Sequence, residues 1–271
     1  MTTEQATYSH GHHKSVVEDH ARRTAKDSAA YLIPHIKPTD VILDVGCGPG
    51  TITADLAALA SHGKVVGCDA VDTVLQQASE YAGSRGLTNV TFQKVDANAL
   101  PFDDNTFDIV HCHQVLQHVK NPVAILKEMR RVVKPGGIVA AREADYKTFA
   151  WYPELPEIAR WMDLYQKVAR ANGGEPNAGR YCHVWAKEAG FEQSAIEVTW
   201  DVWRYSGVRA QQFSKSWTGR ILQPGFLATA ERENFATEDE IRGISEAWKQ
   251  WGSHDQAFIA IPHGEVLCWK T

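Results

Sequence analysis

The sequence predicts an α/β protein whose core is a doubly wound, mostly parallel sheet of seven strands. From Val41 to Ala141, short apolar runs rich in Val and Ile alternate with stretches of helical pattern. Continuous apolar runs are typical of strands buried on both faces of a parallel sheet, and their alternation with helices is the pattern of a doubly wound fold. With 271 residues, of which 44% are hydrophobic, the chain can form a large core without metals or disulfides.

The elements of the first half follow one another in regular order. We expect strands at residues 41–45, 65–69, 90–96, 107–113 and 136–143, with helices at residues 51–60, 72–84 and 122–133. Local signals support the boundaries of the last of these helices. Asn121 and Pro122 supply a cap and a first-turn proline, and the run Lys-Pro-Gly-Gly that begins at Lys134 stops the helix.

The second half has a different character, because all nine tryptophans lie at or beyond Trp151. We expect helices at residues 154–172, 178–189 and 237–251, and two strands that complete the sheet at residues 194–205 and 257–270. The segments at about 146–190 and 206–256 are expected to form helical additions over the carboxyl edge of the sheet.

The chain is expected to form one integrated domain in three parts. These are an N-terminal cap at residues 1–33 with a helix at residues 14–33, a ligand-binding core at residues 34–145, and the remaining strands with helical insertions at residues 146–271.

Composition argues against several classes of partner. The net charge is −5, the pI is near 6.2, and no run of Lys or Arg is longer than a pair, so nucleic acid is not expected as a substrate. The five cysteines are odd in number and lack a C-x-x-C spacing, which predicts reduced thiols in the cytoplasm. Neither a signal peptide nor a membrane span is expected, and no protein partner is evident.

A glycine-rich turn follows the first expected strand. The run VILDVGCGPG contains Asp44, Gly46, Gly48 and Gly50, which we call the glycine turn. Glycines allow the backbone to approach a ligand closely, and the amides of the following helix remain available to bind it. The spacing Gly-x-Gly-x-Gly differs from the Gly-x-Gly-x-x-Gly of dinucleotide-binding proteins, which argues against an NAD-dependent oxidoreductase.

Polar residues also end the next three strands. Asp69 ends the second strand about 20 residues after the glycine turn, where a carboxylate can accept hydrogen bonds from both hydroxyls of a ribose. Asp96 with Ala97 ends the third strand, and His113 with Gln114 ends the fourth.

These motifs, together with RRVVKPGG before the fifth strand, resemble the class I S-adenosylmethionine-dependent methyltransferases, which have a Rossmann-like fold. The resemblance implies that the glycine turn wraps the amino-acid end of the cofactor and that Asp96 and Ala97 contact its adenine. It further implies that His113 and Gln114 face its amino group and methyl. The implied cofactor-binding residues are Asp44, Gly46, Gly48, Gly50, Asp69, Ala70, Asp96, Ala97, His113 and Gln114.

A wider resemblance covers residues 8–38 and 100–137 and continues over almost the whole chain. These segments are similar to small-molecule methyltransferases of the ubiquinone and menaquinone type. Within that group the chain is most similar to the fungal thiol methyltransferases that act on reduced dithiols such as dithiol gliotoxin. The resemblance implies methyl transfer to a thiol of a small secondary metabolite. The alternatives are C- or O-methylation of a quinol-like metabolite and a regulator that binds the cofactor without turnover.

Methylation of nucleic acid bases is disfavoured by the segment after the fourth strand. Amino-methylases carry an Asp/Asn-Pro-Pro-aromatic turn there, whereas this chain has His113-Gln114-Val115-Leu116.

The need for a catalytic base depends on the acceptor. A thiol with an unperturbed pKa near 8.5 is partly ionised at neutral pH, so a dedicated base is optional for it. A phenol or carbon acid needs one, and His113, His118, Glu143 and Asp145 are the candidates.

A metal site is not expected. His111 and His113 point the same way on one strand, but no third ligand accompanies them at suitable spacing. His10, His12 and His13 are more plausible as part of a cap over the cofactor.

Aromatic residues are concentrated in the added region. Trp151, Trp161, Tyr165, Trp185 and Trp217 either form the core of that region or line a cavity for the acceptor. Gln114 is the other expected contact of the acceptor.

Overall fold

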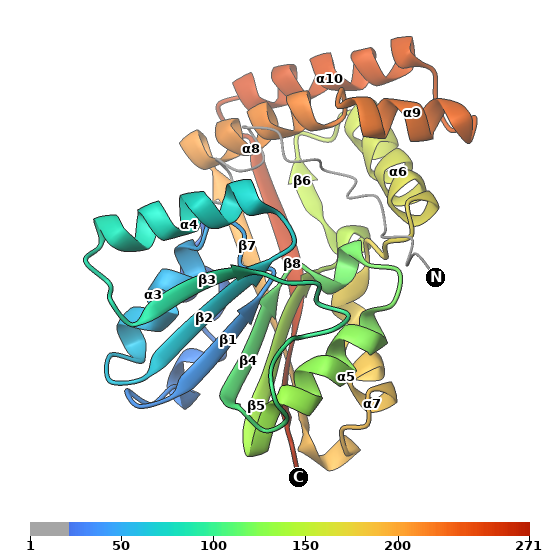
Figure 1. Ribbon diagram of the computed structural model, residues 1–271. Helices are drawn as coiled ribbons and strands as arrows, with labels where there is room; N and C mark the ends of the chain where they lie inside the picture. The colour runs from blue at the N-terminus through green and yellow to red at the C-terminus, as the bar shows by residue number, and fades with distance from the viewer. Residues whose placement is uncertain (1–21) are drawn as a thin grey trace.

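A computed structural model describes residues 22–271 of the chain and contains one eight-stranded sheet (Figure 1). The strands are β1 (Val41–Val45), β2 (Lys64–Asp69), β3 (Val90–Lys94), β4 (Phe107–His113), β5 (Val133–Ala144), β6 (Ala150–Tyr152), β7 (Ile196–Ser206) and β8 (Phe258–Trp269). Their order is β3-β2-β1-β4-β5-β8, with β7 on the far edge of β8. The first five strands are parallel, and β8 is antiparallel to β5, β6 and β7. The predicted doubly wound, mostly parallel sheet is confirmed.

Helices cover both faces of the parallel part of the sheet. On one face, α2 (Ala25–Ser28) and α3 (Thr51–Leu59) pack on alternate strand residues such as Ile42 and Ile109, with α4 (Asp72–Ser84) beside α3. On the other face, α5 (Pro122–Val132) and α7 (Cys182–Glu188) pack on the intervening residues, such as Leu43 and Val110. This division follows from the alternation of side chains along each strand.

Four further helices form a separate layer beyond the carboxyl ends of the parallel strands, at the top of Figure 1. They are α6 (Pro156–Ala171), α8 (Gly207–Arg220), α9 (Pro224–Arg232) and α10 (Glu238–Ser253). Short 3-10 turns connect the elements: η1 (Ile33–His35), η2 (Leu116–His118), η3 (Tyr146–Thr148), η4 (Ala178–Arg180) and η5 (Gln193–Ala195). The helical layer was predicted at this edge, although the helices at residues 207–220 and 224–232 were not individually expected. The predicted helix at residues 178–189 is instead η4 and α7, and α7 packs on a face of the sheet rather than over its carboxyl edge.

The long antiparallel pair of β7 and β8, whose strands are separated in the chain by α8, α9 and α10, joins the sheet to the helical layer. β5 pairs with residues 263–269 of β8, whereas β6 pairs with residues 258–260, farther toward its start. The first half of β8 therefore extends beyond the carboxyl end of β5 and carries β6 and the helical layer. The seven-strand prediction missed β6, because three residues are too few to show a strand pattern.

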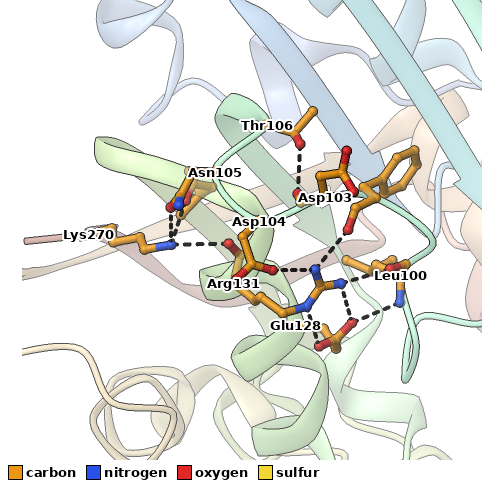
Figure 2. A network of polar contacts seen from close by, with 10 residues as sticks. Leu100, Asp103, Asp104, Asn105, Thr106, Glu128, Arg131 and Lys270 are labelled. Atoms are coloured by element: carbon orange, nitrogen blue, oxygen red, sulfur yellow. Dashed lines mark hydrogen bonds and ion pairs between the residues drawn. The ribbon is translucent and has the colours of Figure 1, made fainter.

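A polar network fixes the opposite, amino edge of the sheet (Figure 2). Arg131, at the end of α5, pairs with Glu128 and Asp104, both at 2.8 Å. Lys270, just after β8, donates to Asn105 Oδ1 at 2.7 Å and to the carbonyl of Val133 at 2.8 Å. These contacts tie α5, the loop before β4 and the end of β8 together, away from the carboxyl edge.

The predicted N-terminal helix at residues 14–33 is wrong in its described part. Thr24 and Asp27 form a capping box that begins the single-turn helix α2, which ends at Ser28 and is followed by η1. A capping box starts a helix rather than continuing one, because the side chains satisfy the first free amides. Residues 14–21, and with them most of the predicted cap, lie outside the described part.

α2 is anchored to the far edge of the sheet. The indole Nε1 of Trp203 on β7 donates to the carbonyl of Asp27 at 2.7 Å. In the part of the chain that the structure covers, no helix combines the length and apolarity needed to cross a membrane.

Candidate functional site

The glycine turn connects β1 to α3 and has a packed side and an open side. The amide of Gly46 donates to the carbonyl of Cys68 at 2.8 Å, which holds the turn against β2. Gly46, Gly48 and Gly50 have φ of 69°, 53° and 76°, in the left-handed region that favours glycine. A Cβ on Gly46 would lie 2.4 Å from Val115 Cγ2, whereas a Cβ on Gly48 would meet no atom of residues 22–271 within 4 Å. The space at Gly48 is a cradle that a ligand can fill.

Asp44 supports this turn from behind. Its carboxylate is 3% exposed and accepts hydrogen bonds from Thr53 Oγ1 at 2.6 Å and His111 Nδ1 at 2.8 Å. Asp44 therefore links β1 to α3 and β4 and fixes the backbone that a ligand would contact.

Two further carboxylates lie at the carboxyl ends of β2 and β3. Asp69 ends β2 and accepts the amide of Gly48 at 3.0 Å and the amide of Val71 at 3.1 Å. Asp96, after β3, is exposed and accepts both the backbone and side-chain amides of Asn98 at 2.9 and 2.8 Å. The strand order puts the two carboxylates and the glycine turn in a row along one edge, as the ribose and adenine of the expected cofactor require. Ala70 and Ala97 follow them on the same edge.

The residue after β4 has an unusual backbone. Gln114 has φ of 54°, which is uncommon for a residue other than glycine and marks local strain. Its amide donates to the carbonyl of Arg142 on β5 at 2.8 Å. Its side-chain Nε2 lies 2.9 Å from His263 Nε2 on β8.

The imidazole of His263 fixes the orientation of that amide group. Its Nδ1 lies 2.8 Å from the carbonyl of Ile261, so Nδ1 carries the proton and Nε2 accepts from Gln114. Burial, reinforced by Arg142, lowers the pKa of His263 well below its usual value. The carbonyl oxygen of Gln114 therefore lies on the side away from the imidazole.

His113 is held neutral beside a buried arginine. Its Nε2 accepts from Arg142 Nη1 at 3.1 Å, and burial, together with Arg23 and Arg142, lowers its pKa well below the usual value. Arg142 is fully buried, pairs with Glu265 at 3.0 Å, and lies 4.8 Å from the centre of the Trp203 ring.

His113 and its buried neighbours form one surface. Most of these residues were not predicted from the sequence to belong to the site. Register pairs His113 with Arg142, and Arg142 with Glu265, so the three side chains share a face of the sheet. Asp201 pairs with His263 on the same face. Arg142 could have been noticed in the sequence as a charged residue inside the apolar run GGIVAARE. Its carboxylate partners, however, lie on β7 and β8, far away in sequence.

Glu143 binds backbone amides and has no exposed surface. Its Oε1 accepts the amides of Val115 at 2.9 Å and Leu116 at 2.8 Å, and its Oε2 accepts the amide of Gln117 at 3.2 Å. Burial raises the pKa of Glu143 to about 7, although the three amides act in the opposite direction.

The other two candidate bases are also engaged. Asp145 is fully buried and accepts two hydrogen bonds from Arg180, both at 2.6 Å. His118 Nε2 lies 2.9 Å from Gln117 Nε2, whose own Oε1 accepts the amide of Ala144, and burial lowers the pKa of His118 to about 3. The lone pair of His118 is thus occupied by the Gln117 amide.

The expected aromatic residues separate into three groups. Trp161, Tyr165 and Trp217 are at most 1% exposed and pack on one another in the helical layer, which favours the interpretation that they form its core. Trp185 lies on α7, on the face of the sheet opposite His113, and does not share the surface of His113.

Trp151 on β6 differs from these. It lines a hollow of about 440 Å³. Its buried Nε1 has no hydrogen-bond partner among the described residues, a property that it shares with Trp161. The other lining residues are Phe149, Ala150, Glu154, Leu155, Pro156 and Ala159.

Potential metal ligands are dispersed in the described structure. Between residues 22 and 271, no three or more His, Cys, Asp or Glu side chains gather in a way that could hold an ion. His10, His12 and His13 lie outside these residues. His111 pairs with Asp44 instead.

A doubly wound sheet with a glycine turn after β1 and acidic residues after β2 and β3 defines a class I S-adenosylmethionine-dependent methyltransferase. Residues 36–198, more than half of the chain, match the family described as a methyltransferase domain. The chain therefore belongs to this family, and its cofactor is S-adenosylmethionine.

Full-length relatives agree with this assignment. The chain is 34% identical to an uncharacterized methyltransferase of Schizosaccharomyces pombe, with coverage of 99% of this chain and 98% of the relative. It is also 34% identical to the probable methyltransferase ltbC of Aspergillus luteorubrus, with coverage of 99% of both chains. A demethylmenaquinone methyltransferase of Geobacillus stearothermophilus is 40% identical over 42% of this chain and 49% of its own length.

A solved structure shares the fold. A phosphoethanolamine N-methyltransferase of Haemonchus contortus, in complex with S-adenosylhomocysteine and phosphomonomethylethanolamine, superposes with a TM-score of 0.55. The sequence identity is 21%, and the match covers 90% of this chain and 52% of the other.

Proposed function

We propose that this methyltransferase transfers a methyl group to a thiol sulfur of a small, reduced dithiol metabolite of the gliotoxin type. The observation that carries the proposal is that all four candidate bases are already engaged. His113 and His118 use their lone pairs to accept hydrogen bonds, Glu143 accepts three amides, and Asp145 is paired with Arg180. A thiol suits such a site, because a few per cent of it is already thiolate at neutral pH.

The carboxyl edge supplies the cofactor contacts in this proposal. S-adenosylmethionine brings an electrophilic sulfonium methyl. The glycine turn and its open side at Gly48 hold the amino-acid end. The carboxylate of Asp69, followed by Ala70, accepts hydrogen bonds from the ribose hydroxyls, and Asp96 and Ala97 contact the adenine. Gln114, fixed by His263, faces the point where donor and acceptor meet. The main task of these residues is to orient the reactants and exclude water, which can contribute roughly 7–11 kcal/mol.

A continuous aromatic surface leads from Gln114 to the helical layer. Along β8, the alternate residues His263, Ile261 and Ile259 share one face, and their partners on β7 are Asp201, Trp203 and Tyr205. Trp151 on β6 pairs with Ile259 on that same face. The body of the acceptor would lie along these rings, with the hollow at Trp151 at its far end.

Two further observations support a small thiol acceptor. All five cysteines are free and buried, as expected for a protein of the reducing cytoplasm, where a dithiol metabolite stays reduced. The full-length relative from Aspergillus luteorubrus is a fungal protein, as are the thiol methyltransferases that the sequence resembles.

The principal alternative is C- or O-methylation of a quinol. It is favoured by the partial match to demethylmenaquinone methyltransferases. A regulator that binds the cofactor without turnover is the second alternative.

Mass spectrometry of reactions with reduced gliotoxin, its disulfide form and a quinol separates these functions. The proposal expects one and then two methyl groups on the reduced dithiol and none on the disulfide. Transfer to the quinol with untouched thiols would replace the thiol assignment. Cofactor binding without transfer to either acceptor class would favour the regulator.

A further inference from the structure

Three consecutive backbone amides after Gln114 converge on one buried carboxylate. We propose that Glu143 is a positioning residue that holds the loop after β4, so that Gln114 and the glycine turn keep the arrangement needed for methyl transfer. The inference rests on the proposed function only in the role given to Gln114 at the meeting point of donor and acceptor.

The geometry of the loop requires such an acceptor. β4 ends at His113, and Gln114 has φ of 54°, so the amides that follow it lie outside the β4 ladder. Glu143 Oε1 accepts the amides of Val115 and Leu116, and Oε2 accepts that of Gln117. Buried amides without acceptors are costly, so the carboxylate selects this loop conformation.

The same contact reaches the glycine turn. Val115 Cγ2 lies where a Cβ on Gly46 would be only 2.4 Å away, so the side chain of Val115 packs directly on that turn. Because Glu143 fixes the amide of Val115, one carboxylate positions both walls of the expected cofactor site.

Close backbone packing shields Glu143 from water. A Cβ on Gly264 would lie 2.0 Å from the carbonyl of Gly179, and a Cβ on Gly179 would lie 2.8 Å from the carbonyl of Glu143. Only glycines allow β8 and η4 to approach so closely. The carboxylate is consequently fully buried.

Among the groups around Glu143, its own carboxylate is the one whose ionisation near pH 7 can change the hydrogen bonds to the loop. Arg142 is the neighbour of Glu143 on β5 but points to the opposite face of the sheet. The thiols of Cys112 on β4 and Cys182 on α7 have raised pKa values because they are buried, so they stay neutral at pH 7. Asp145, beyond them, is paired with Arg180. Protonation at Oε2 would leave the two bonds to Oε1 and weaken the bond from Gln117.

The variant Glu143→Gln imitates this protonated form, because an NH2 group replaces one oxygen. We expect kcat to fall at least tenfold, the Kd of S-adenosylhomocysteine to rise severalfold, and amide exchange at residues 115–117 to accelerate. In the wild-type protein, cofactor-product affinity should weaken as pH falls through about 7, and this limb should be absent from the variant.

Glu128→Gln is the matched control. Glu128 also accepts a loop amide, that of Leu100 at 2.9 Å, but it belongs to the network at the amino edge (Figure 2). This variant should leave kcat and the pH limb unchanged.

The outcomes are distinct. Unchanged kcat, affinity and pH dependence in a folded Glu143→Gln protein would overturn the proposal. Faster exchange with weaker product binding, in a protein that methylates no thiol, would support Glu143 while refuting the acceptor. Should the variant fail to fold, calorimetric titration of the wild-type protein with S-adenosylhomocysteine from pH 5.5 to 8.5 decides the matter, because affinity independent of pH in this range contradicts the proposal.

Discussion

Gln114 and His263 lie 149 residues apart in the chain, yet their side chains meet at 2.9 Å between the two Nε2 atoms. The antiparallel pairing of β8 with β5 produces this contact, because it brings His263 beside the carboxyl end of β4. The imidazole accepts from the amide and is itself fixed by the carbonyl of Ile261. The last strand of the sheet thus determines how the residue after the fourth strand faces the site.

Replacement of His263 by Phe should therefore impair turnover more than folding. The half-buried Gln114 amide would lose the acceptor that fixes its orientation, and we expect kcat/KM to fall about tenfold, which corresponds to about 1.4 kcal/mol of transition-state stabilisation. Steady-state kinetics and calorimetry with S-adenosylmethionine would measure the effect. His62→Phe, at an exposed position between α3 and β2, is the control. Equal kcat/KM values in the two variants would show that Gln114 needs no fixed orientation.

Substitutions in the glycine turn should separate folding from cofactor binding. Both Gly46→Ala and Gly48→Ala incur the left-handed backbone penalty of roughly 1–2 kcal/mol. Only Gly46→Ala also places a Cβ 2.4 Å from Val115 Cγ2, so its Tm should fall further. Gly48→Ala adds a methyl group in open space, where it should weaken S-adenosylmethionine binding about tenfold. Thermal unfolding and calorimetry of both variants test this contrast, and the reverse pattern would place the ligand elsewhere.

Glu143 should also make stability depend on pH. Its pKa is raised from 4.5 to about 7 in the folded protein, so its contribution to stability is fully present below pH 4.5 and is lost as pH rises through 7. The shift corresponds to about 3 kcal/mol at most, at 1.36 kcal/mol per unit. Urea unfolding of the wild-type protein and Glu143→Gln between pH 4.5 and 8 isolates this contribution. A free-energy difference between the two proteins that does not change with pH would contradict the assignment.

The parallel part of the fold is predictable from the sequence because strands buried on both faces of a sheet consist of continuous apolar runs. The runs VILDV and VVGCD became β1 and β2 with little change in their bounds. The glycine turn and Asp69 were also accessible, since residues at the ends of parallel strands meet at one edge.

The remainder depends on contacts between distant segments. Arg142 and His263 reach their partners at the site only because β4, β5 and β8 pair in this register, and no local sequence pattern encodes that register. Thr24 interrupts the expected N-terminal helix through a capping box that was present in the sequence but was outweighed by the apolar periodicity around it. The sequence shows Glu143 only as a carboxylate near a strand end, which made it a candidate base. The three backbone amides that bind it are apparent only in the folded structure.

Trp151→Phe should distinguish acceptor binding from cofactor binding. The change keeps an aromatic ring in the hollow but removes the buried Nε1, which has no partner in the described structure. If the acceptor provides one, KM for the acceptor should rise severalfold, since a hydrogen bond contributes about 0.5–1.5 kcal/mol. The Kd of S-adenosylmethionine should not change. Trp185→Phe, on the opposite face of the sheet, serves as the control.

An unchanged acceptor KM in Trp151→Phe would remove this hollow from the acceptor site. A simultaneous loss of cofactor affinity would instead indicate a general effect on the helical layer.

The dependence of rate on pH tests the chemistry of the acceptor most directly. If a thiolate attacks the methyl group and no residue removes the proton, kcat/KM for a dithiol should rise with pH and level off near the pKa of the substrate thiol, around 8.5. Acceptors with more acidic thiols should reach the plateau at lower pH, so the midpoint should follow the substrate rather than the enzyme. His113 and His118 are held neutral by burial throughout this range, so neither should add an inflection, and the limb expected from Glu143 lies lower, at about pH 7. A midpoint that stays constant across a series of thiols would instead assign the proton transfer to a residue of the protein and would contradict unassisted attack by a thiolate.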